Sequence, residues 1–197
     1  MGHGIGSVSL RRFDHAFDSE GQLTEMLHRA FARLGAMGLN CTCVDQTPAV
    51  TLQRATAGDC FVALSNGCPI GTLTLYGRDS DSLCDHYHRS DVASVRQFGI
   101  DPPWQSRGVG RALLTFAEHW AIMRGYAQLA LDTPYPASHL LAFYRSQGFR
   151  VVDVVRFAGK VYDSAILSKP LAATAMHRVA LPVPHETSPA VGLALAC

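Results

Sequence analysis

The stretch QSRGVGRALL, residues 105–114, places Gly108 and Gly110 one residue apart, directly before a segment with helical periodicity. Glycine lacks the β-carbon that would keep a ligand away from the main chain. The first turn of a helix also leaves backbone N–H groups without partners and carries a partial positive charge. Arg107 and Arg111 can add charge-assisted hydrogen bonds. The loop therefore predicts a site for an anionic group such as a diphosphate.

Two familiar phosphate-binding loops fit these residues poorly. A Walker loop ends in Gly-Lys-Ser/Thr, whereas Gly110 is followed by Arg111 and Ala112. A dinucleotide-binding loop needs a small residue three positions after its second glycine, and Leu113 stands there. A glycine-rich turn that holds no ligand stays open as an alternative at this point.

The pattern of apolar residues around the loop indicates a mixed α/β domain. Two hairpins are expected, one across Asn66-Gly67 and one across Ala158-Gly159. The helix after Val109 is the best defined, with Leu113, Phe116, Ala117, Trp120 and Met123 on one face. The expected order is a strand at 7–12, a helix at 23–34, an irregular segment at 39–50, strands at 61–64 and 70–76, an exposed connection at 77–91, a strand at 92–100, the helix from 109, a strand at 127–131, a helix at 138–147, and strands at 150–157 and 161–168.

Length and composition fit one globular domain. The chain has 197 residues, of which 48% are hydrophobic and 17% are charged. We expect a domain over residues 1–170 and a flexible or loosely docked tail over 171–197, where periodicity is lost. The net charge of +1 gives no reason to expect a nucleic-acid or membrane-surface partner, and small molecules are favoured. No export signal or long apolar run is evident, so a cytoplasmic location is the default expectation.

Two longer motifs, FGIDPPWQSRGVGRALL and LALDTPYPASHLLAFYRSQGF, occur in this order and together resemble the GNAT family of N-acetyltransferases. The resemblance implies a strongly twisted, mostly antiparallel sheet with flanking helices, whose fourth and fifth strands splay apart. It implies acetyl-CoA as the acyl donor, with its pantetheine arm in that slot beside the main chain of Phe98 and Ile100. The diphosphate would lie on the loop, so that the coenzyme-binding residues include Gln105, Ser106, Arg107, Gly108, Val109, Gly110, Arg111 and Ala112.

The resemblance also assigns two catalytic candidates. Tyr144 stands where the family commonly has a general acid that protonates the coenzyme A sulfur, and Asp132 aligns with a carboxylate that serves as base in some members. A tyrosine packed in the core and a carboxylate that caps a turn are the ordinary alternatives. The family often has an asparagine seven residues before the tyrosine, but this chain has Ala137, which removes one expected contact.

A second cluster of chemically active residues precedes the predicted fourth strand. Residues 84–88 read CDHYH, and they could contribute to acceptor binding, ligate a metal through Asp85, His86 and His88, or form a solvated loop. No metal site is assigned to them. Cys41 and Cys43 lack a second ligand pair and are interpreted as structural.

The sequence thus predicts an N-acetyltransferase that transfers an acetyl group from acetyl-CoA to a primary amine of a small molecule, by direct attack in a ternary complex. A non-catalytic acyl-CoA-binding module and an enzyme that acetylates a protein amine are the alternatives. The acceptor and the choice between monomer and homodimer are left open.

Overall fold

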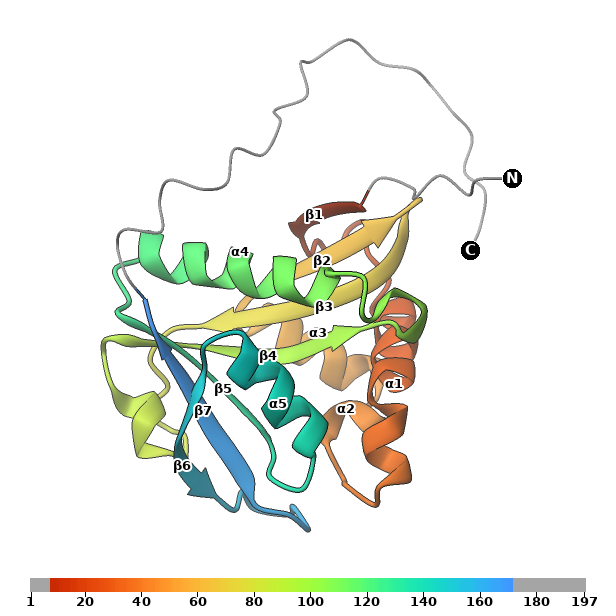
Figure 1. Cartoon of the computed structure of the whole chain (residues 1–197). Helices are drawn as coiled ribbons and strands as arrows, with labels where there is room; N and C mark the ends of the chain where they lie inside the picture. Colours follow the sequence, from red (N-terminus) through yellow and green to blue (C-terminus); the bar gives the residue numbers. More distant parts are fainter. Residues whose placement is uncertain (1–7, 172–197) are drawn as a thin grey trace.

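A seven-stranded sheet with the order β1-β2-β3-β4-β5-β7-β6 organises this computed structural model, which describes residues 8–171 (Figure 1). Neighbouring strands are antiparallel except for β4 and β5, which run parallel. The predicted class, a mostly antiparallel sheet with flanking helices, is confirmed. The strands are β1 (Val8–Arg12), β2 (Asp59–Ser65), β3 (Cys68–Tyr76), β4 (Val92–Ile100), β5 (Gln128–Pro134), β6 (Arg150–Val155) and β7 (Ser164–Pro170).

Helices cover both faces of the sheet. The helices α4 (Val109–Met123) and α5 (Ser138–Ser146) lie across the face turned toward the viewer in Figure 1, where Leu113, Leu114 and Leu141 pack on alternate residues of the central strands. On the other face, α1 (Glu20–Ala36) buries Leu23 and Leu27 against Val62 of β2. Two short helices, α2 (Thr42–Asp45) and α3 (Pro48–Thr56), follow α1.

Local signals set several of these boundaries. The Ser19 hydroxyl caps α1 by accepting a hydrogen bond from the Gln22 N–H (3.2 Å). Asn66 and Gly67 have φ of 52° and 81°, the left-handed conformations that a tight hairpin needs, so the predicted β2–β3 turn is confirmed. Gly148, with φ of 90°, ends α5, and Phe149 is buried as expected for its hydrophobic contact.

Three sequence-based expectations about elements are wrong. Residues 39–50 are helical in part: Thr47 accepts from the Val50 N–H (3.4 Å) and Pro48 occupies the first turn of α3, a start signal that the search for apolar periodicity overlooked. Met123 is 71% exposed, because it lies at the last turn of α4, beyond the sheet. The last strand begins at Ser164 rather than at 161.

The segment 77–91 is also not simply an exposed connection. It contains a 3₁₀ helix, η1 (Asp85–His88). It also buries Cys84 and Tyr87 against Val92, Ala130 and Ile166. A second 3₁₀ helix, η2 (Pro102–Trp104), follows β4, which ends there as the Asp-Pro-Pro sequence predicts.

The predicted domain boundary at 170 coincides with the end of β7, but the tail predicted over 171–197 lies outside the described residues apart from Leu171. Within residues 8–171, no helix is both long and apolar enough to cross a membrane.

Candidate active site

The strands β4 and β5 separate at the centre of the sheet. Their parallel pairing runs from Val92–Gln128 to Val95–Leu131 and goes no further. Beyond that point β4 continues beside β3 as far as Ile100, while β5 continues beside β7 as far as Pro134. The two strands therefore enclose a slot that no other strand of the described chain fills.

A β-bulge turns the main chain of β4 at this slot. The register between β3 and β4 shifts so that Leu73 faces both Gln97 and Phe98, and Gln97 has φ of 51°. The N–H of Asp101 donates to the Ile70 carbonyl (2.9 Å). Since backbone groups alternate in direction along a strand, those of Phe98 and Ile100 turn away from β3 and toward the slot.

One of these slot-facing groups already has a partner. The Ile100 carbonyl accepts a hydrogen bond from Gln105 Nε2 (2.9 Å). A carbonyl oxygen has a second lone pair, so it can still receive a donor from a ligand. Gln105, which the sequence analysis placed in the diphosphate loop, thus also lies against the end of β4.

The predicted anion loop, residues 105–112, leads from the slot into α4. Ser106 and Gly108 both have positive φ, 59° and 87°, and this bends the chain so that the helix begins at Val109. The first backbone hydrogen bond of the helix is donated by Ala112 to the Gly108 carbonyl (3.0 Å). The N–H groups of Val109, Gly110 and Arg111 precede it and have no helical partner, which is the geometry of an anion site.

The side chains of this loop leave the main chain accessible. Gln105, Ser106, Arg107, Gly108, Arg111 and Ala112 are exposed, whereas Val109 and Gly110 are half-buried. A β-carbon added at Gly108 would meet nothing within 4 Å, and one at Gly110 would lie 3.6 Å from Phe98, Ile100 and Phe143. Gly110 therefore borders the apolar wall of the slot.

Tyr144 lies on that wall. It is 7% exposed, and its ring packs on Phe98, with 6.4 Å between the ring centres, and on Phe149, with 6.1 Å. Burial, and to a lesser degree the negative charge of Asp132, raise the pKa of its hydroxyl above the ordinary value. Tyr144 is therefore a neutral hydrogen-bond donor throughout the physiological pH range.

Asp132 lies on β5 and on the opposite face of the sheet from Tyr144. Its side chain is accessible to solvent. The surrounding protein nevertheless desolvates the carboxylate and raises its pKa, against the opposing effects of the Arg96 charge and of a hydrogen bond from Tyr87. A carboxylate with a raised pKa is a stronger base than an ordinary aspartate.

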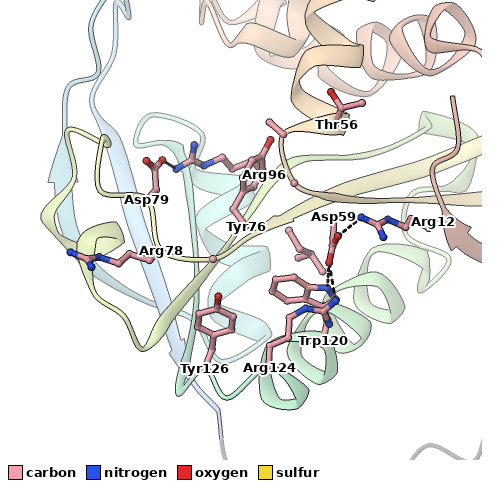
Figure 2. Close-up of a pocket in the computed structure, with 14 residues that line it drawn as sticks. Arg12, Thr56, Asp59, Tyr76, Arg78, Asp79, Arg96, Trp120, Arg124 and Tyr126 are labelled. Carbon is pink, nitrogen blue, oxygen red and sulfur yellow. Dashed lines mark hydrogen bonds and ion pairs between the residues drawn. The ribbon is translucent and has the colours of Figure 1, made fainter.

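The hydrogen bond to Asp132 comes from a residue that the sequence analysis did not single out. The buried Tyr87 donates its hydroxyl to Asp132 Oδ1 (3.3 Å). Arg96 lies 5.3 Å from the centre of the Tyr87 ring and 5.1 Å from that of Tyr76. Its guanidinium donates to Asp79 (2.5 Å), beside which it lies in Figure 2. In the sequence, the only sign that Tyr87 is buried was its position three residues after Cys84, which is buried as well.

The two histidines of the CDHYH cluster are directed elsewhere. His88 Nε2 is hydrogen-bonded to the Ser82 carbonyl (2.7 Å), and burial lowers the pKa of His86. In the described chain, no three His, Cys, Asp or Glu side chains are grouped so that they could hold a metal ion. Cys41 and Cys43 are buried free thiols, in agreement with a structural role.

A separate groove lies at the other end of α4. It has a volume of about 620 Å³ and is lined by Arg12, Asp59, Tyr76, Arg78, Asp79, Arg96, Trp120, Arg124 and Tyr126, among others (Figure 2). Since a helix of this length spans about 22 Å, the groove is remote from the anion loop at Gly108. It contains none of the predicted coenzyme-binding residues, but it includes Arg96, whose charge acts on Asp132.

Several known proteins are similar to this chain. An uncharacterized N-acetyltransferase of Methanocaldococcus jannaschii is 27% identical over 96 residues, which are 49% of this chain and 41% of that relative. The match therefore spans less than half of the relative's length.

Solved structures share the fold over most of the described residues. The ribosomal-protein-S18-alanine N-acetyltransferase from Escherichia coli has a TM-score of 0.61 at 18% identity and matches 84% of this chain and 95% of its own. A GNAT family acetyltransferase from Elizabethkingia anophelis, solved with acetyl-CoA bound, has a TM-score of 0.60 at 18% identity and matches 83% and 98%. The PaiA N-acetyltransferase from Thermoplasma acidophilum, in complex with coenzyme A, has a TM-score of 0.63 at 16% identity and matches 83% and 99%.

The family assignment comes from the sequence itself. The model of the Acetyltransferase (GNAT) family matches residues 22–149, which is more than half of the chain and includes β4, the anion loop and α5. The splayed strands and the loop at the start of α4 agree with the fold that the resemblance implies. This chain belongs to the GNAT family of acetyltransferases.

Proposed function

We propose that this protein is an N-acetyltransferase that moves an acetyl group from acetyl-CoA to a primary amine of a small molecule, by direct attack in a ternary complex. The observation that carries the proposal is that the pairing of β4 with β5 ends at Val95–Leu131. The chain then leads from β4 to the anion loop, where the first N–H groups of α4 have no helical partner. Two neighbours in fold were solved with acetyl-CoA or coenzyme A bound, which supports this donor.

The described residues can hold this donor at two levels. The N–H groups of Val109, Gly110 and Arg111 suit the diphosphate, with Arg107 as an added cation. The slot-facing main chain of Phe98 and Ile100 can bond the amide groups of the pantetheine arm, as a strand would. A backbone N–H at the bulge can also polarise the thioester carbonyl.

The acceptor amine must be neutral before it can attack. An alkyl ammonium with a pKa of about 10.4 costs about 4–5 kcal/mol to deprotonate at pH 7. Desolvation raises the pKa of Asp132, so the difference between the pKa of this base and that of the ammonium is smaller than for an ordinary aspartate. We assign it the role of accepting the proton, directly or through one water molecule.

The transfer then balances with the two candidates in place. Asp132 passes the proton that it took from the ammonium to solvent. The neutral amine nitrogen then bonds to the thioester carbonyl carbon and gives a second proton to Asp132, and the carbon–sulfur bond of the tetrahedral intermediate breaks. The departing sulfur takes a proton from the Tyr144 hydroxyl, which regains one from solvent. The products are the N-acetylated amine and free coenzyme A. In this scheme the Asp132 carboxylate and the Tyr144 hydroxyl act from opposite faces of the sheet.

A panel of primary amines tests the proposal through release of free thiol from acetyl-CoA. We expect release that depends on at least one amine. Tight binding of coenzyme A with no amine-dependent release would instead favour the non-catalytic acyl-CoA-binding alternative.

A further inference from the structure

Cations outnumber carboxylates around Asp132. Arg54 of α3, Arg96 of β4 and Lys160, which precedes β7, all act electrostatically on its carboxylate. Arg96 is already paired with Asp79. In the described chain, no carboxylate lies within ion-pairing distance of Arg54 or Lys160, so Asp132 alone faces two uncompensated positive charges.

Neutral groups hold the Arg54 guanidinium in place. Its guanidinium donates to Gln46 Oε1 (2.8 Å) and to Cys43 Sγ (3.4 Å). The Gln46 amide in turn donates to Gln97 Oε1 (3.3 Å), so Arg54 is linked to the bulge residue that adjoins Arg96. The Tyr76 hydroxyl also fixes the main chain of α3 at this position by donating to the Arg54 carbonyl (2.6 Å).

Lys160 is positioned from the other side in the same way. Its ammonium donates to the Asn40 carbonyl (2.8 Å) and to the Thr42 hydroxyl (3.0 Å), both of them neutral groups. These residues flank Cys41, whose sulfur accepts a hydrogen bond from Tyr162 (3.3 Å). These contacts fix the Lys160 side chain between α2 and the β6–β7 connection.

A buried donor without a partner lies in the same region. Gln97 is 4% exposed, and its Nε2 has no hydrogen-bond partner in the described chain. An unsatisfied buried amide costs free energy that a ligand oxygen would recover. The groups left to bind a ligand are therefore donors, since Gln97 Oε1 is already bonded to Gln46 and the side chains of Arg54 and Lys160 only donate. Donors suit an anionic ligand oxygen rather than a second amine.

The charge balance around Asp132 determines which amines are favoured there. An acceptor that arrives as a simple ammonium brings a further positive charge to a site that already has an excess, whereas an amino acid arrives with no net charge. From these contacts we infer that the acceptor is an amine that carries a carboxylate close to the amino group, such as a free α-amino acid. Its amino group would face Asp132 while its carboxylate accepts from Arg54 and Gln97. This inference rests on the proposed function and narrows it.

Matched pairs of acceptors test the inference. Each pair consists of a free amino acid and its α-carboxamide, in which the negative charge is replaced by a neutral group and the amine is kept. Coenzyme A release is measured with both, and we expect kcat/KM to be about ten- to hundred-fold higher for the acids, the factor of one charge-assisted hydrogen bond. Equal or better turnover of the carboxamides, or of peptides with free N-termini, overturns the inference and leaves the proposed transferase function standing.

Variants locate the preference. Arg54→Gln should lower the acid-to-carboxamide ratio toward one, mainly through KM of the acids, and Arg54→Lys should restore part of it. Lys160→Gln is the second variant, in case Arg54→Gln disturbs α3. Arg150→Gln, at an exposed position of β6, is the matched control and should leave the ratio unchanged. An unaltered ratio in both Arg54→Gln and Lys160→Gln contradicts the inference. Binding of acetyl-CoA with no turnover of any acid, carboxamide or other primary amine overturns the inference and the proposed function together.

Discussion

Asp132 and Tyr144 lie on opposite faces of the sheet, and the same physical cause shifts the pKa of both. Desolvation raises each value, which strengthens the carboxylate as a base and keeps the hydroxyl protonated. In the proposed mechanism, the proton acceptor for the amine and the proton donor for the sulfur are therefore separated by the main chain of β5.

Removal of the Tyr144 hydroxyl tests its proposed role as acid. We expect Tyr144→Phe to lower kcat by about 10²-fold or more, the usual contribution of a positioned acid or base. The affinity for acetyl-CoA should be retained, since the ring contacts with Phe98 and Phe149 remain. Steady-state kinetics and a binding titration measure the two quantities, and Tyr126→Phe at the far end of α4 is the control. Unchanged turnover would remove Tyr144 from the mechanism.

Asp132→Asn tests the base. We expect a large loss of turnover in the variant. In the wild type, kcat/KM should fall as the pH drops through the pKa of Asp132, at a higher pH than the value of about 3.9 for an ordinary aspartate. A pH profile with no acidic limb above that value, or a variant with full activity, would contradict the assignment.

The same substitution should not destabilise the fold. Because the folded pKa is raised, the contribution of Asp132 to stability is full below the unfolded pKa and is lost as the pH rises through the folded value. The asparagine removes that penalty, and its oxygen can still accept from Tyr87. Thermal unfolding at neutral pH should therefore give Asp132→Asn a Tm at or above that of the wild type, and a clear decrease would show that the ionised carboxylate stabilises the protein.

At the scale of elements, Asp59 joins three parts of the chain. Its carboxylate accepts from Arg12 of β1 (2.5 Å), and from Trp120 Nε1 and Arg124 at the end of α4 (both 2.9 Å), as Figure 2 shows. The Trp120 ring is buried and stacks on Tyr126, with 6.0 Å between ring centres. Asp59 therefore ties the C-terminal end of α4 to the edge of the sheet.

We expect Asp59→Ala to lower the free energy of unfolding by about 1–3 kcal/mol, because the buried Trp120 N–H loses its acceptor. For a chain of this size, that is a decrease in Tm of several degrees. Thermal and urea unfolding measure it. Asp85→Ala is the matched control, since the Asp85 side chain is fully exposed, and equal Tm values for the two variants would refute the role of Asp59.

The elements differ in how far the sequence could predict them, for physical reasons. The anion loop and the β2–β3 hairpin depend on local glycine conformations at Gly108 and Gly67, so short motifs were sufficient. The helices α2 and α3 bury mainly small residues, such as Cys43 and Ala55, and therefore give no clear apolar period. The contact between Tyr87 and Asp132 joins residues 45 positions apart and follows only from the folded sheet.

At the scale of the whole molecule, the slot depends on which strands pair and where pairing ends. No local pattern in 92–100 or 127–134 predicts that β4 and β5 part after Val95 and Leu131; only the family resemblance implied it. The groups that act on the Asp132 charge come from α3, β4 and the connection before β7. The position of Arg54 and Lys160 around Asp132 therefore required the structure.

A substitution in the anion loop tests its link to coenzyme binding. Gly108 has φ of 87°, which a β-branched residue adopts only with strain, so Gly108→Val should displace the N–H groups that follow it. We expect a large loss of acetyl-CoA affinity by calorimetry. Gly125→Val introduces the same strain, at φ of 81°, at the other end of α4, and should bind acetyl-CoA as the wild type does. Equal affinity in both variants would contradict the assignment.

The most direct measurement follows the backbone amides themselves. In an NMR titration of the isotopically labelled protein with coenzyme A, the N–H groups of residues 106–111 should show the largest chemical-shift changes, followed by those of Phe98 and Ile100. Changes confined to the groove near Asp59 and Trp120, with the loop unaffected, would contradict the account of how this protein holds its acyl donor.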